Sequence, residues 1–114
     1  MGDDRQGKKG AMTSGIVTNL VFVRAQAGKV AELEEALKEL AQEARKEPGS
    51  IAYELHRSAS EPDEYLVYEM WRSKGDLDAH MKAAVVQAFL ARVLEFVDGA
   101  SNLRLFTPVD IGRI

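Results

Sequence analysis

The chain has 114 residues with a formal net charge of −3, and 46% of them are hydrophobic. These values fit one domain with a modest core. The lack of cysteine excludes disulfides, thiolate catalysis and Cys-ligated zinc or iron–sulfur centres. Basic residues are scattered among acidic ones, so neither nucleic acid nor a membrane surface is an expected partner. Since no apolar run could span a bilayer or act as a secretory signal, we expect a cytoplasmic protein.

The first half of the chain predicts a strand, a helix and a second strand. Residues 1–15 are polar and glycine-rich, and we expect a disordered leader, or residues added to the natural chain, before one domain over residues 16–114. Residues 16–24 are apolar and β-branched, which predicts a strand. Apolar residues at helical spacing predict a helix over residues 30–45 that ends at Pro48-Gly49. Alternation then predicts a strand over residues 51–57.

The second half predicts a strand, helical segments and a last strand. Residues 65–72 carry apolar side chains on both faces, so this strand is expected at the centre of a sheet with both faces covered. Ser73 followed by Asp76 resembles a capping box, before a short helix over residues 77–81. A longer helix should follow, with an apolar stripe of Val85, Phe89, Val93 and Phe96, and a last strand over residues 103–106.

This order of elements predicts an α+β fold of the ferredoxin-like βαββαβ type, an antiparallel sheet with its helices on one face. The opposite face would still carry large apolar residues from the second and third strands. A second copy of the same sheet is the simplest cover for that face. We therefore expect a homodimer that associates through its sheet faces.

Residues 69–80 bring three chemically useful side chains together. Glu69 and the only tryptophan, Trp71, are two positions apart on a strand and point to the same face, and His80 follows on the next helix. His80 is either a general acid or base, because imidazole ionises near neutral pH, or a histidine that packs against a turn. Glu69 either orients His80 or forms an ion pair with an arginine, the candidates being Arg72, Arg57 and Arg104.

Other residues could line the same pocket. Asn19 is unusual within an apolar strand, so its amide either bonds to a neighbouring loop or anchors a substrate carbonyl or an oxygen species. Trp71 and Tyr53 are either core residues or pocket walls. Two histidines on separate elements, without a tight carboxylate cluster, make a weak metal-ligand set, so we expect no metal and no other cofactor.

Several motifs in order resemble the antibiotic biosynthesis monooxygenase (ABM) family of dimeric α+β-barrel proteins. They are Asn19 in the first strand, the turn at residues 47–53, the strand Tyr68-Glu69-Met70-Trp71, the segment Leu77-Asp78-Ala79-His80 and the last strand at residues 102–106. Each motif alone is weak, but their order and spacing across residues 16–110 are specific.

The resemblance implies a cofactor-independent monooxygenase that oxidises a quinol-like or polycyclic aromatic substrate with molecular oxygen. It implies His80 as the base or proton shuttle, and Asn19 and Trp71 as the groups that hold the substrate or oxygen intermediate. Tyr53 and Glu69 would support them, and Phe89 would contact the substrate. The cavity is expected between the sheet and the second helix.

One isomerase activity and one binding role remain as alternatives, whereas heme degradation is disfavoured. The chain also resembles heme-degrading oxygenases, but Leu90 stands where their axial histidine is expected and cannot ligate iron. It is similar to isomerases of phosphorylated signalling sugars as well, although the apolar residues 83–86 argue against a phosphorylated substrate. An isomerase of a small carbonyl or signalling-sugar compound on the same fold and a non-catalytic binder of an apolar metabolite therefore stay open.

Overall fold

The computed structural model describes residues 15–99 and 102–112, so residues 1–14 of the expected leader lie outside the described residues. Four strands form one antiparallel sheet in the order β2-β3-β1-β4. This arrangement confirms the predicted ferredoxin-like α+β fold. The elements are β1 (Val17–Arg24), α2 (Val30–Ala44), β2 (Ser50–Arg57), β3 (Glu64–Trp71), α3 (Lys74–Met81), α4 (Ala84–Phe96) and β4 (Asn102–Phe106).

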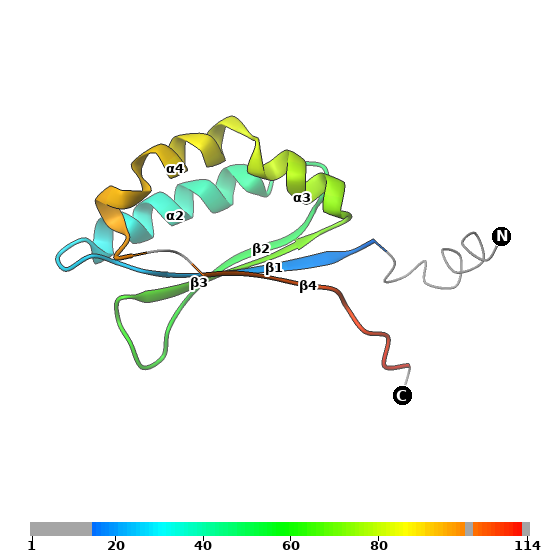
Figure 1. The fold of residues 1–114 in the computed structure, drawn as a ribbon, viewed down its shortest axis with the longest axis horizontal. Coiled ribbons are helices and arrows are strands. Elements are labelled where there is room, and N and C mark those ends of the chain that lie inside the picture. Colours follow the sequence, from blue (N-terminus) through cyan, green and yellow to red (C-terminus); the bar gives the residue numbers. More distant parts are fainter. Residues whose placement is uncertain (1–14, 100–101, 113–114) are drawn as a thin grey trace.

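The helices α2, α3 and α4 cover the same face of the sheet, as Figure 1 shows. The core lies between these two layers, and the alternate residues of β1 and β3 that face the helices are buried, except that Val21 is half-buried. β3 is an inner strand, as predicted, but helices cover only one of its faces. Its opposite side chains, Leu66, Tyr68 and Met70, remain half-buried in the single chain. No helix in the described part of the chain is long and apolar enough to cross a membrane.

α2 packs on the sheet through its apolar stripe and is also tied to the strands by a polar cluster. Leu33, Leu37 and Ala44 are buried on the face of the helix that packs against the sheet. Glu34, on the same helix, accepts a hydrogen bond from the Tyr65 hydroxyl at 2.7 Å and pairs with Arg57. The hydrogen bond from Tyr65 and the Arg57 guanidinium lower the pKa of Glu34 to about 2. The carboxylate therefore stays ionised at neutral pH and links α2 to β2 and β3.

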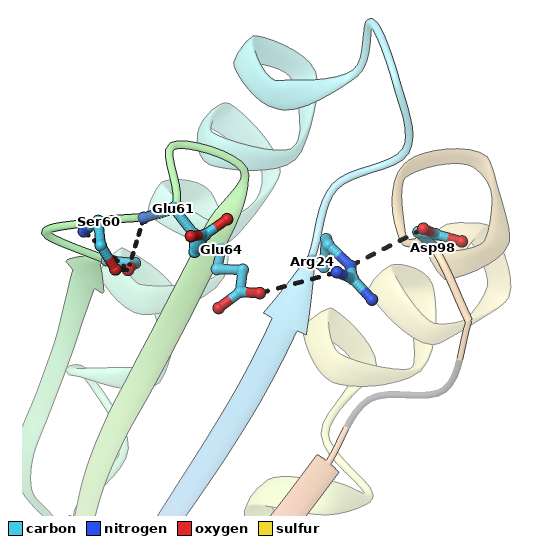
Figure 2. Close-up of polar contacts among 6 residues, drawn as sticks. Arg24, Ser60, Glu61, Glu64 and Asp98 are labelled. Atoms are coloured by element: carbon cyan, nitrogen blue, oxygen red, sulfur yellow. Dashed lines mark hydrogen bonds and ion pairs between the residues drawn. The ribbon is translucent and has the colours of Figure 1, made fainter.

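The end of α4 is fixed against the end of β1. Figure 2 shows Arg24 between two carboxylates, Glu64 at 3.8 Å and Asp98 at 3.8 Å. Backbone hydrogen bonds reinforce this contact, from the Asp98 N–H to the Arg24 carbonyl at 2.8 Å and from the Gln26 N–H to the Phe96 carbonyl at 2.7 Å. These contacts hold α4 at a set position relative to the sheet, and so define the space between them.

The turn after α2 is held against the turn that joins β3 to α3. The Gly49 carbonyl accepts a hydrogen bond from the Arg72 N–H at 2.9 Å. A Cβ atom at Gly49 would lie 2.3 Å from Asp76 Cγ, so this close approach requires glycine. Ser73 Oγ accepts from the Asp76 N–H at 3.1 Å and caps α3, which begins at Lys74, earlier than the predicted residue 77.

Candidate functional site

Three polar side chains form a row across the helix-facing side of the sheet. In the strand register Glu69 of β3 lies opposite Asn19 of β1 on one side and opposite Tyr53 of β2 on the other. Their exposed fractions are 3% for Glu69, 1% for Asn19 and 3% for Tyr53. A sheet face that otherwise carries mainly valine and aromatic side chains therefore contains one buried polar band.

A cavity of about 230 Å³ lies above this band, between the sheet and all three helices. Its polar lining comes from Asn19, Tyr53, Glu69 and His80, all of which the sequence analysis had selected. The remainder is apolar, and Leu90, at 45% exposure, places one wall at the protein surface. The apolar lining residues are Val21, Val23, Leu37, Leu40, Val67, Met81, Val86, Phe89, Leu90 and Val93.

His80 lies between two carboxylates and is only 2% exposed. Its Nδ1 atom is 3.0 Å from Glu47 Oε2, a hydrogen-bond distance. Its Nε2 atom is 3.9 Å from Glu69 Oε1, too long for a hydrogen bond. When Nδ1–H donates to Glu47, the neutral ring keeps Nε2 as the nitrogen that can accept a proton from a molecule in the cavity.

Trp71 contributes to the site from outside the cavity lining. It is fully buried, and its ring centroid lies 4.6 Å from that of His80. Its Nε1–H donates to Glu69 Oε1 at 2.9 Å. The indole therefore supports both titratable groups at once, by packing against the imidazole and by hydrogen bonding to the carboxylate.

The electrostatics of Glu69 follow from this placement. Burial raises the pKa of Glu69, while the Trp71 N–H and the nearby His80 lower it in part. The arginine partner considered from the sequence is not observed among the described residues, since Arg72 pairs with Asp76 and Arg57 with Glu34. Glu69 is instead a carboxyl group that burial biases toward its neutral form.

Tyr53 is the remaining member of the polar lining of the cavity. Its ring packs edge-on against His80 at a centroid distance of 5.4 Å and against Trp71 at 6.3 Å. Burial raises the pKa of the Tyr53 hydroxyl, and the negative charges of Glu69 and Glu47 raise it further. The phenol therefore stays protonated at neutral pH and can act as a hydrogen-bond donor.

The sequence model of one protein family matches residues 16–92, and its description is "Antibiotic biosynthesis monooxygenase". That match covers well over half of the chain and includes every residue of the polar lining of the cavity. The chain belongs to the antibiotic biosynthesis monooxygenase family. The family assignment agrees with the resemblance that the sequence motifs indicated.

Solved structures similar to this ABM protein support the fold. A Caulobacter crescentus protein, provisionally described as an antibiotic biosynthesis monooxygenase, is 26% identical with a TM-score of 0.79, covering 90% of this chain and 99% of that one. PA3566 from Pseudomonas aeruginosa is 20% identical with a TM-score of 0.80, covering 86% and 98%. Rv0793 from Mycobacterium tuberculosis is 22% identical with a TM-score of 0.80, covering 86% and 99%.

A curated relative matches over a shorter stretch. The uncharacterized protein sll1783 of Synechocystis is 24% identical over 62 residues, which is 54% of this chain and 42% of that protein. The matched stretch spans less than half the length of that relative.

One residue of the site was missed by the sequence analysis. Glu47 contacts His80 across 33 positions of sequence, yet it entered the analysis only as part of the turn motif at residues 47–53. A usable signal was present, because a carboxylate just beyond the C-terminus of a helix is electrostatically unfavourable. The turn at Gly49 holds Glu47 at this unfavourable position, which indicates that the Glu47 carboxylate has a partner elsewhere in the fold.

Two further features bear on cofactors. Leu90, which the sequence motifs predicted to stand where a heme-degrading oxygenase would need an iron ligand, lines the cavity with an aliphatic side chain. Within the described residues, the carboxylates of Glu61, Asp63 and Glu64 approach one another within 4.8 Å at the turn between β2 and β3. Glu64 already pairs with Arg24, and none of the three lines the cavity. This acidic group gives no reason to infer a metal.

Proposed function

We propose that this protein is a cofactor-independent monooxygenase that oxidises a quinol-like or polycyclic aromatic substrate with molecular oxygen. The observation that carries the proposal is the orientation of His80 by Glu47 beside a largely apolar cavity. An imidazole is suited to general-base catalysis when one nitrogen is hydrogen-bonded to a carboxylate and the other is free to accept a proton. The apolar walls suit a flat aromatic ring system.

The reaction needs a base, an oxyanion partner and a dry cavity. His80 would take the proton of a phenolic hydroxyl, and hydrogen bonds from Asn19 and Tyr53 would stabilise the phenolate. The electron-rich phenolate reduces O₂ and forms a carbon–oxygen bond at a ring carbon that carries hydrogen. The resulting hydroperoxide loses water and leaves a carbonyl, so one oxygen atom enters the product and the other leaves as water. All four electrons come from the substrate.

His80 and Glu69 together also support a second candidate function. Proton transfer on a small carbonyl compound needs a base and a neutral acid, and burial biases Glu69 toward the neutral form. Such an isomerase would turn over without oxygen. Anaerobic turnover therefore separates this candidate from the monooxygenase.

We also propose that the protein works as a homodimer through the sheet face that the helices leave open. Residues on that face include Leu20, Phe22, Leu66, Met70 and Phe106, and Phe22 and Phe106 are 40% and 43% exposed. An apolar patch of this kind on a single chain is usually an interaction surface. A second identical sheet offers a flat apolar surface of matching shape.

An oxygen electrode tests the proposed activity. Purified protein is mixed with a panel of naphthalene- and anthracene-derived quinols, and oxygen uptake is compared between the wild type and His80→Ala. We expect protein-dependent uptake with part of the panel and a loss of about 10²- to 10⁴-fold in the variant. Uptake that His80→Ala leaves unchanged would remove His80 from the mechanism, and no uptake with any quinol would favour the isomerase.

A further inference from the structure

A second hollow lies on the far side of one wall of the cavity. It is a groove of about 130 Å³ between α2 and α4, which pack side by side (Figure 1). The groove opens at the protein surface, since its lining includes the exposed residues Glu39, Ala88 and Arg92. Leu40 and Phe89 line both the groove and the cavity. These two side chains therefore form the partition between the cavity and the groove.

Of the two residues in the partition, Phe89 is the one that can move. Leu40 is 7% exposed and belongs to the buried core, whereas Phe89 is half-buried and packs at the edge of that core. An aromatic side chain on a helix has two common χ1 wells, so its ring can rotate without a change in the backbone. Rotation of Phe89 would join the groove to the cavity.

Short side chains leave the groove open, and aromatic ones line it. Ala36 of α2 and Ala88 of α4 are both part of its lining, where longer side chains would fill the space. Phe96 also lines it, with the guanidinium carbon of Arg92 at 4.9 Å from its ring centroid. The groove therefore offers a flat aromatic ring both an apolar surface and a cation.

We propose that Phe89 is a gate, and that the groove is a subsite for the far ring of a ligand with three rings fused in a line, whose near end lies beside His80. This inference rests on the proposed function and narrows its polycyclic substrate to that length. The cavity alone, at about 230 Å³, is below the roughly 300–1,000 Å³ usual for drug-sized ligands. A three-ring ligand needs the additional space of the groove, whereas a two-ring ligand needs only the cavity.

Two non-oxidisable probes of different length test the subsite without turnover. Quinoline has two fused rings and acridine has three in a line, and both are uncharged in mildly alkaline buffer. Titration calorimetry would give both dissociation constants for the wild type and for Ala88→Leu, a change that fills the groove from outside the cavity lining. We expect Ala88→Leu to weaken acridine binding by about tenfold and to change quinoline binding by less than about twofold.

The gate is tested by removing the ring that forms it. In Phe89→Ala the ligand no longer has to displace the partition, so the preference for acridine over quinoline should rise by about threefold or more relative to the wild type. Using the ratio of the two dissociation constants cancels the contact that both probes lose with Phe89. A preference unchanged from the wild type would overturn the role of Phe89 as a gate.

Matched variants make the result decisive. Ala91→Leu is the control, since Ala91 is exposed on α4 and lines neither the cavity nor the groove. Ala36→Leu repeats the test from α2 if Ala88→Leu fails to fold. Equal weakening of both probes by Ala88→Leu, an effect no larger than that of Ala91→Leu, or no binding of acridine to the wild type would overturn the inference. Because neither probe consumes oxygen, this outcome is independent of whether the proposed monooxygenase activity is found.

Discussion

At the scale of single residues, the account depends on the contact between Glu47 and His80. A carboxylate that accepts from Nδ1–H fixes the ring orientation and the tautomer, and it stabilises the imidazolium that forms when the base takes a proton. Glu69 cannot replace it, since its oxygen lies 3.9 Å from Nε2. Glu47 is therefore a positioning residue, and His80 is the proposed catalytic base.

Glu47→Gln is expected to lower kcat by about 10²-fold, with KM changed by less than about twofold, because the amide no longer stabilises a charged imidazole. Steady-state kinetics over a range of pH measures both parameters. Glu43→Gln is the matched control, since Glu43 lies on α2 and pairs with Lys46 at the surface. A Glu47→Gln variant as active as the control would contradict the role given to Glu47.

The buried carboxyl of Glu69 should make stability depend on pH. Its pKa is raised above the usual 4.5 in the folded protein. As the pH rises above 4.5 the unfolded chain ionises while the folded one stays protonated, so the wild type loses unfolding free energy until the folded pKa is passed. Glu69→Gln avoids this loss, and its stability relative to the wild type should rise through that window.

Urea unfolding at several pH values from about 4 to about 8 measures that difference. Glu54→Gln serves as the control because Glu54 is exposed on β2. A stability difference between Glu69→Gln and the wild type that does not change with pH would show that the carboxyl titrates normally.

The sequence was a good guide to some site residues and a poor one to others. Glu69, Trp71 and His80 could be grouped because strand alternation and a short connection place them together. Glu47 could not, because its contact with His80 depends on how the turn at Gly49 packs against Asp76, which no local pattern encodes. The indole partner of Glu69 was likewise missed, since an arginine is the more usual partner of a buried carboxylate.

At the scale of elements, apolar periodicity located the strands and helices because each element has one face in a single core. The differences lie at element ends. α3 begins at Lys74 because the Ser73 side chain caps it, whereas the apolar pattern alone becomes visible only at Leu77. The position of the turn that carries Glu47 relative to α3 depends on a contact between two loops. Filling the space at Gly49 tests this contact.

Gly49→Ala is expected to destabilise the protein by about 1–3 kcal/mol, because its Cβ would lie 2.3 Å from Asp76 Cγ. Chemical denaturation gives the free energy of unfolding. Gly75→Ala is the matched control, since its Cβ would have only an ordinary contact at 3.7 Å with Ser73 Oγ, and alanine favours the helix. Equal stability of the two variants would contradict the tight packing of the two turns.

At the scale of the whole molecule, helices cover one face of the sheet, and the other face is left open by the residues that the structure describes (Figure 1). The helix-covered face builds the cavity, so association through the open face would leave the site of each subunit intact. The order of the elements predicted this two-layer arrangement, and the apolar residues on the second face of β3 predicted that a further cover is needed. The partner for the second face remains a prediction.

Met70→Glu is expected to convert a dimer to a monomer, because it places a charge in the middle of the open apolar face. Light scattering coupled to size-exclusion chromatography measures the mass. Leu94→Glu is the control, since Leu94 is 76% exposed on α4 and lies outside the cavity lining. A wild-type protein that is monomeric at all concentrations would contradict the proposed dimer.

The central claim is that this chain, without a cofactor, transfers one oxygen atom from O₂ to an aromatic substrate with His80 as the base. The most direct test is mass spectrometry of the product formed under isotopically labelled O₂, with metal-free protein and a quinol that the oxygen electrode identifies. The account predicts one labelled oxygen atom in each product molecule, and none above background with His80→Gln. Product formed at the same rate without O₂, or product whose new oxygen comes from water, would contradict it.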